Sequence, residues 1–269
     1  MSTATMTGAR AAHSPAMRAT ARVGLTARAI VYLLMGGLAI DIAVGGSKRP
    51  ANQQGALAEV AATPGGSVLL VLIAAGFAGY ALWRLSQALF NTSPEGSDGK
   101  ERAKCAARGI VYALLCGTAV NVLTGSAGST QDKQQAGMTA SLMHHEGGRW
   151  LVGIAGVVVV VVGAYLVAEG VRRKFVDHLN TGRMSRRTQK VVVALGAVGT
   201  TARGAVVGLA GVLVVAAAIT ADPKESRGLD GALRTLAHQP LGTWLLGIAA
   251  LGLLAFGSYG LAEAKWSQV

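Results

Sequence analysis

Apolar residues in this chain are concentrated in six long blocks and do not follow an amphipathic period. Each block approaches or exceeds the roughly 20 residues that a helix needs to cross about 30 Å of hydrocarbon. Because every backbone N–H and C=O needs an internal partner in lipid, the pattern predicts six transmembrane helices. The blocks cover residues 23–44, 67–90, 105–123, 151–171, 199–219 and 242–261.

Composition supports a membrane protein over a soluble one. Of the 269 residues, 51% are hydrophobic and 14% are charged, whereas about 25% are charged in a typical soluble domain. Six helices of this kind would leave no polar outer layer to meet water. A cleaved signal peptide is an alternative for the first block, with Arg10, Arg18 and Arg22 as its charged region. The internal repeats argue against it, because the first block completes the first repeat.

The repeats begin with a short phrase that contains an arginine: TARAIVY at 26–32, AARGIVY at 106–112 and TARGAVV at 201–207. A polar loop with a related motif follows: GALAEVAATPGG at 55–66, GMTASLMHHEGG at 137–148 and GALRTLAHQPLG at 231–242. The apolar spacing of these motifs is explained by short helices. Each motif leads into an apolar helix with a tyrosine, at Tyr80, Tyr165 and Tyr259. The repeated unit is therefore helix, loop, helix.

Two crossings return the chain to its starting side, so the three repeats are parallel. A pseudo-threefold bundle about the membrane normal and a row of hairpins both satisfy this pattern. The predicted divisions are a flexible cytoplasmic tail (1–21), repeat 1 (22–90), a cytoplasmic linker (91–104), repeat 2 (105–172), a basic cytoplasmic linker (173–198) and repeat 3 (199–266).

The three arginine phrases, the Gly-Ala-Leu loop motifs and the endings YLVAE (165–169) and YGLAE (259–263) carry a resemblance to a known family. The chain resembles the bacterial membrane family catalogued as domain of unknown function 1206, in which a pair of transmembrane helices occurs three times. The resemblance covers about residues 20–266. It implies the topology alone, because no activity comes with the family.

Basic residues predict the orientation. Outside the apolar blocks, the loops on the side of the N-terminus hold fourteen Lys and Arg, and the opposite loops hold seven. The positive-inside rule therefore places both termini in the cytoplasm, in a bacterial inner membrane. The net charge of +12 is explained by topology and by attraction to anionic phospholipids at the cytoplasmic face, and not by nucleic-acid binding.

Charged residues recur at the inner ends of the blocks. The odd-numbered helices begin near an arginine and two even-numbered helices end near a glutamate, so we expect Arg108 to pair with Glu169 and Arg203 with Glu263. The first repeat has Arg84 at the glutamate position, which leaves a cross-repeat partner, a phospholipid phosphate or an anion for its arginines. The candidate intramembrane charge network is Arg28, Arg84, Arg108, Glu169, Arg203 and Glu263.

The depth of Arg203 is ambiguous. The apolar segment VVVALGAVG (191–199) precedes it, and a crossing that began there would place the arginine near the bilayer centre. Repeat register favours a shallower position.

Two polar residues, Asp41 and Asn121, share one repeat position near the outer ends of their helices. Because the third repeat has Ala216 there, a helix-bonding role is favoured over a proton or cation relay. The adjacent His144, His145 and Glu146 lack the one-turn spacing of helical metal ligands, so no metal is predicted. No P-loop, dinucleotide fingerprint or nucleophile elbow occurs, so no cofactor and no enzymatic activity are predicted.

Two classes of function remain, of which the sequence favours the first, a permeation pathway, with the second as its alternative. A permeation or small-solute pathway along the pseudo-threefold axis predicts that Arg28, Arg84 and Arg108 line a hydrated cavity. A structural or accessory protein that binds lipid or a membrane-complex partner predicts that the charges form intramolecular contacts. An intramembrane enzyme would need converging acid and base groups, which the sequence does not provide.

Overall fold

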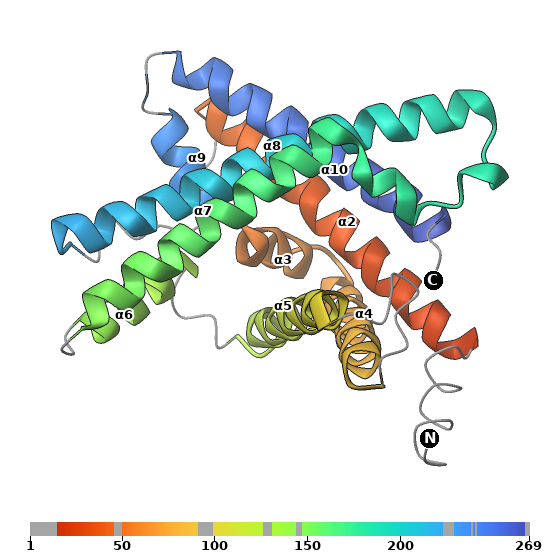
Figure 1. The fold of residues 1–269 in the computed structure, drawn as a ribbon, viewed down its shortest axis with the longest axis horizontal. Helices are drawn as coiled ribbons and strands as arrows, with labels where there is room; N and C mark the ends of the chain where they lie inside the picture. Colours follow the sequence, from red (N-terminus) through yellow and green to blue (C-terminus); the bar gives the residue numbers. More distant parts are fainter. Residues whose placement is uncertain are drawn as a thin grey trace. The chain divides into compact units, whose positions relative to one another are not determined.

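The computed structural model describes residues 15–45, 50–90, 99–125, 131–143, 147–222, 229–237, 239 and 241–266. These ranges form helices and no strands (Figure 1). The long helices are α2 (Pro15–Ala43), α4 (Gly66–Phe90), α5 (Gly99–Leu123), α7 (Gly148–Arg172), α8 (Arg186–Thr220) and α10 (Gly242–Trp266). The short ones are α3 (Gln53–Ala61), α6 (Gln131–Met143) and α9 (Leu229–Ala237), with the 3-10 turns η1 (Lys174–His178) and η2 (Thr181–Arg183) between α7 and α8.

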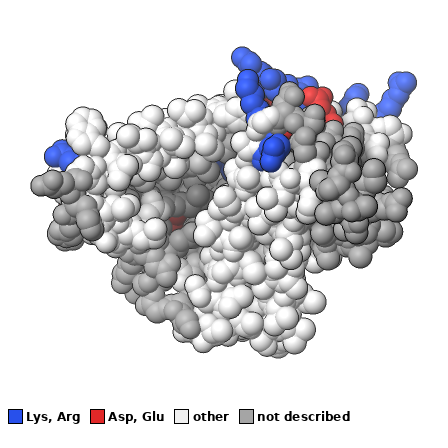
Figure 2. Space-filling view, turned by 60° about the horizontal axis from the view of Figure 1, so that its bottom comes forward, with Lys and Arg blue, Asp and Glu red and all other residues white. Residues whose placement is uncertain are grey.

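All six long helices have the length and apolar composition of membrane spans, as predicted. Large apolar side chains on α5 and α7 face outward, among them Ile110, Leu114, Val157 and Val161. In Figure 2 much of the visible surface carries no charged side chain, and most of the visible Lys and Arg gather along its upper edge. Continuous apolar surface is stable against lipid and unfavourable in water. The chain is an all-α integral membrane protein.

The three loop motifs form short helices, as their apolar spacing predicts. Leu57 of α3 and Leu233 of α9 are fully buried, so both helices are anchored by a central leucine. In α6 the position equivalent to these leucines holds Thr139, which is buried, whereas the neighbouring Met138 and Leu142 are exposed. The second repeat therefore keeps the helix without the same anchoring.

Several long helices begin earlier than the apolar blocks indicate, by the largest margins α2 and α8. The predicted tail, 1–21, overlaps α2, which begins at Pro15. The predicted basic linker, 173–198, is largely folded, because η1 and η2 lie within it and α8 begins at Arg186. Ser185 caps α8 by accepting a hydrogen bond from the Thr188 N–H. The backbone hydrogen bonds of a helix continue through polar residues. An apolar block in the sequence therefore locates the lipid-exposed part of a helix but not its polar first turns.

The chain divides into two compact units, the first of which contains Met1–Ile30, Leu57–Ser126 and Gly260–Val269. In this unit α4 packs on α5. The ring of Tyr112 meets Phe77 edge to face at 5.8 Å and lies 4.2 Å from the ring of Tyr80. Aromatic contacts therefore fill the middle of this helix pair.

The second unit contains Val31–Ala56 and Ala127–Tyr259, and here α7 packs closely on α8. A methyl group built on Gly163 would lie 2.5 Å from the Cα and N of Gly208, so the two backbones touch at this point. At the other end of α7, Arg149 donates hydrogen bonds to the carbonyl oxygens of Ala218 and Ile219 in the last turn of α8. Close backbone contact through small residues is a principal source of helix association in lipid.

The helix pairs follow one rule with respect to the repeats. The second helix of repeat 1 (α4) packs on the first helix of repeat 2 (α5), and the second helix of repeat 2 (α7) packs on the first of repeat 3 (α8). The second helix of repeat 3 (α10) contacts the first of repeat 1 (α2), since the rings of Phe256 and Tyr32 lie 4.7 Å apart. The positions of the charged side chains therefore depend on contacts between different repeats as well as on contacts within a repeat.

Candidate functional site

Equivalent aromatic contacts mark two of these helix pairs. Tyr32 meets Phe256 at an interplanar angle of 73°, and Tyr112 meets Phe77 at 74°. Each tyrosine lies four residues after a repeated arginine, and each phenylalanine lies three residues before a repeated tyrosine. The repeats therefore conserve this contact in space, next to the charged positions.

Arg28 of α2 forms an ion pair with Glu263 of α10. The two side chains are 15% and 21% exposed, so the pair is largely shielded. The sequence led us to expect Arg203, of the same repeat, as the partner of Glu263, whereas the ion pair found for this carboxylate is with Arg28. The physical reason is that α10 packs on α2, which brings an arginine of the first repeat to the carboxylate. The cross-repeat partner anticipated for Arg28 is thus Glu263.

Arg203 lies on aromatic faces instead of a carboxylate. Its guanidinium carbon is 5.4 Å from the ring centroid of Tyr32 and 4.9 Å from that of Phe256. Its buried Nε has no hydrogen-bond partner among the described residues. Attraction to ring faces is therefore the main stabilisation of this cation within the described protein.

Glu169 of α7 is partly exposed and makes no ion pair within the ranges that the structure describes. Arg108 belongs to the first compact unit and Glu169 to the second, so their expected pairing stays a prediction. Arg108 is partly exposed on α5, one turn before the buried Tyr112. The position of a charged residue in its repeat therefore does not by itself specify its partner.

Arg84 is buried, at 8% exposure. Its Nε donates to the hydroxyl of Tyr80 and its Nη1 to Oε1 of Gln87, both at 3.1 Å. The guanidinium carbon lies 4.7 Å from the ring centroid of Trp83, and Nη1 lies 3.8 Å from Sγ of Cys105. The sequence identified Arg84 as lacking a local acid but missed these neutral partners, which the one-turn spacing to Tyr80 and Gln87 could have indicated.

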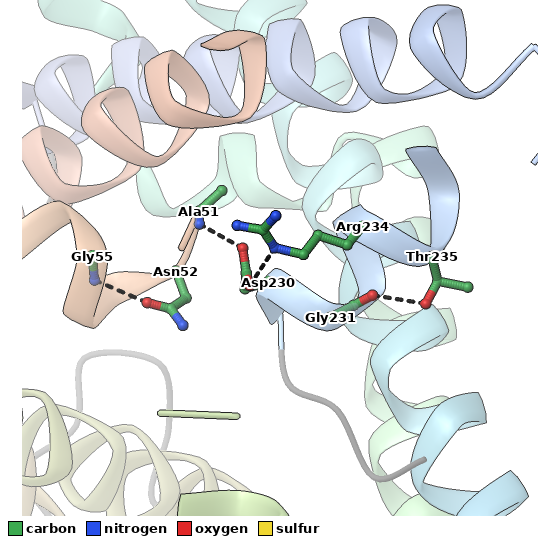
Figure 3. Close-up of polar contacts among 7 residues, drawn as sticks. All are labelled: Ala51, Asn52, Gly55, Asp230, Gly231, Arg234 and Thr235. Atoms are coloured by element: carbon green, nitrogen blue, oxygen red, sulfur yellow. Dashed lines mark hydrogen bonds and ion pairs between the residues drawn. The ribbon is translucent and has the colours of Figure 1, made fainter. Parts of the chain in front are cut away.

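A second polar cluster, which the sequence analysis did not identify, joins α9 to the start of α3 (Figure 3). Buried Asp230 accepts a hydrogen bond from the Ala51 N–H at 2.7 Å and one from Nε of Arg234 at 2.8 Å. Asn52 accepts from the Gly55 N–H at 2.9 Å and so caps α3. The carboxylate therefore links the short helices of the first and third repeats.

Replacing this carboxylate is expected to loosen that link. Asp230→Ala removes the acceptor of the buried Ala51 N–H and of the Arg234 Nε–H, which we expect to cost about 1.5–3 kcal/mol. Asp177→Ala is the matched control, since Asp177 is exposed and should change stability by less than about 0.5 kcal/mol. Thermal unfolding of the two variants in detergent measures the difference, and equal melting temperatures would contradict the role of Asp230.

Comparison with known proteins gives the family but no activity. The chain matches the family described as Domain of Unknown Function (DUF1206) three times, over residues 23–91, 103–173 and 198–267. The chain belongs to the DUF1206 family. It is also 29% identical, over 95% of its length and 93% of the relative's, to "Uncharacterized protein YxxB" of Bacillus subtilis (strain 168). No solved structure matches the chain.

The three matches confirm the tandem repeats of this DUF1206 protein. Asp41 and Asn121, the polar outer-end positions, are both exposed, and neither side chain bonds another helix among the described residues. Their expected helix-bonding role is therefore not observed. His144, His145, Glu146 and His238 lie outside the described residues. Within the described part, no group of three or more metal-binding side chains occurs.

Proposed function

We propose that this DUF1206 protein is a structural or accessory membrane protein that does not transport solutes and has no enzymatic activity. It resides in the bacterial cytoplasmic membrane with both termini in the cytoplasm, and it binds lipid or a membrane-complex partner. The observation that carries the proposal is that its intramembrane cations contact groups of the protein itself. Arg28 pairs with Glu263, Arg203 lies on two aromatic rings and Arg84 binds Tyr80 and Gln87.

Burial of these cations argues against the alternative, a permeation pathway. A pathway for ions or small polar solutes needs charged groups in contact with water, because desolvated charges are costly in lipid. Arg84 is 8% exposed and donates hydrogen bonds to Tyr80 and Gln87, and Arg28 is held by a carboxylate. The Arg28–Glu263 pair holds α2 to α10, which is a structural role.

Flux through reconstituted protein tests the proposal. We expect proteoliposomes to pass protons, chloride and phosphate no faster than protein-free vesicles, with gramicidin as the positive control for proton flux. Flux above background that falls at least tenfold in Arg84→Gln would contradict the proposal and support permeation. Cross-linking in membranes should in turn recover a partner in stoichiometric amount, or lipid alone.

A further inference from the structure

The connection between α7 and α8 is a folded element. Arg173, which ends α7 with φ 55°, donates its N–H to the carbonyl oxygens of Glu169 and Gly170. The 3-10 turns η1 and η2 follow, and Ser185 caps the first turn of α8. Backbone hydrogen bonds at both ends therefore define the path of this connection.

Two apolar side chains anchor the connection to the second unit. Phe175 is 3% exposed, and its ring meets Tyr259 edge to face at 5.1 Å. Leu179 is buried as well. Gly196 of α8 makes room for the phenylalanine, because a methyl group there would lie 2.7 Å from Cζ of Phe175. The connection is therefore held against α8 and α10 by contacts that only a small residue at position 196 permits.

Exposed basic side chains are concentrated in and beside this anchored connection. We call the following six exposed residues the basic platform: Arg172, Arg173, Lys174, Arg186, Arg187 and Lys190. Asp177 is an exposed acid among them. Residues 172–190 of the sequence hold seven Lys and Arg, which are the six of the platform and Arg183, against one acid, Asp177. The element is thus strongly cationic and spatially ordered.

The length of α8 places the platform at a membrane surface. Its 35 residues extend about 52 Å at about 1.5 Å per residue, well beyond a hydrocarbon layer of about 30 Å. The basic turns at its beginning precede the apolar part of the helix. Arg186, Arg187 and Lys190 therefore lie where phospholipid headgroups are found.

We propose that the basic platform binds the headgroups of anionic phospholipids, and that Phe175 is the positioning residue that presents it to them. The complementary ligand is a phosphate ester at the membrane surface, because clustered basic residues beside a membrane span attract anionic lipid. This inference deepens the proposed function, since it rests on lipid as the partner and identifies where lipid binds.

Lipid selectivity of the full-length protein tests the platform. Purified protein in nanodiscs of phosphatidylcholine is titrated with phosphatidylglycerol, and bound lipid is measured by native mass spectrometry. Neutralising Arg186, Arg187 and Lys190 to Gln is expected to reduce the preference for phosphatidylglycerol about tenfold. The matched control neutralises the exposed Lys100, Arg102 and Lys104, and should reduce it less than about twofold. Glycerol 3-phosphate in solution should compete weakly, because a soluble phosphate lacks the membrane anchor.

Variants of Phe175 test whether lipid binding needs an ordered platform or only a basic segment. Phe175→Ala keeps every charge but removes the anchor, and should reduce the phosphatidylglycerol preference severalfold, while Phe175→Leu retains most of it. Equal losses in the two triple variants, or full selectivity in both Phe175 variants at unchanged melting temperature, would overturn the proposal. Recovery of an acidic protein that is lost only from the platform variant, with lipid binding unchanged, would overturn it too. Solute flux with selective lipid binding intact would refute the proposed function alone.

Discussion

Glu263→Gln is expected to destabilise the protein by about 3 kcal/mol, because it leaves the shielded guanidinium of Arg28 without its carboxylate. The two side chains are 15% and 21% exposed, so water cannot fully replace the lost partner. Unfolding in detergent, followed by circular dichroism against temperature, measures the loss. The double variant Arg28→Gln with Glu263→Gln should recover part of it, because neither charge then remains without its partner.

Glu169→Gln provides the control for this experiment. It makes the same chemical change at the equivalent position of the second repeat, where the carboxylate has no ion pair among the described residues. We therefore expect a change of less than about 0.5 kcal/mol. Equal destabilisation by the two glutamine variants, or simple additivity in the double variant, would show that the pair does not hold α2 to α10.

Gly163→Ala is expected to destabilise the protein by about 1–3 kcal/mol, although alanine favours helix formation over glycine. The added methyl group would lie 2.5 Å from the Cα and N of Gly208 and 2.9 Å from the carbonyl oxygen of Gly204. These are backbone atoms, so relief requires α7 and α8 to separate. The melting temperature in detergent and the fraction of monodisperse protein after heating report the effect.

Gly208→Ala makes the same change on the other side of the same contact. Its methyl group would meet nothing closer than the Cα of Gly163 at 3.9 Å, an ordinary van der Waals separation. Helix propensity should then dominate and leave stability unchanged or raise it by up to about 1 kcal/mol. We therefore expect Gly163→Ala to lower the stability of the protein and Gly208→Ala not to lower it. A loss of stability of equal size in both variants would refute the close approach at Gly163.

The sequence supplied the charged residues of the candidate site, but it did not specify which of them form pairs. Arg28 and Arg84 stood out because charges are rare inside apolar blocks, and Glu263 because it follows directly after such a block. Their contacts depend on which helices are neighbours, which a repeated local pattern does not specify. Asp230 escaped notice for the same reason, since its partner Ala51 is 179 positions away in the chain.

Sequence alone determined the six spanning helices, the three repeats and the short loop helices. A backbone in lipid must bond its N–H and C=O groups within the segment, so a long run of apolar residues forms a helix whatever its neighbours are. Tertiary structure decided that Glu263 pairs with Arg28, that Arg203 lies on Tyr32 and Phe256, and that Phe175 anchors the basic platform. These contacts join residues far apart in the chain, and close packing between helices selects one arrangement among several that the same local pattern permits.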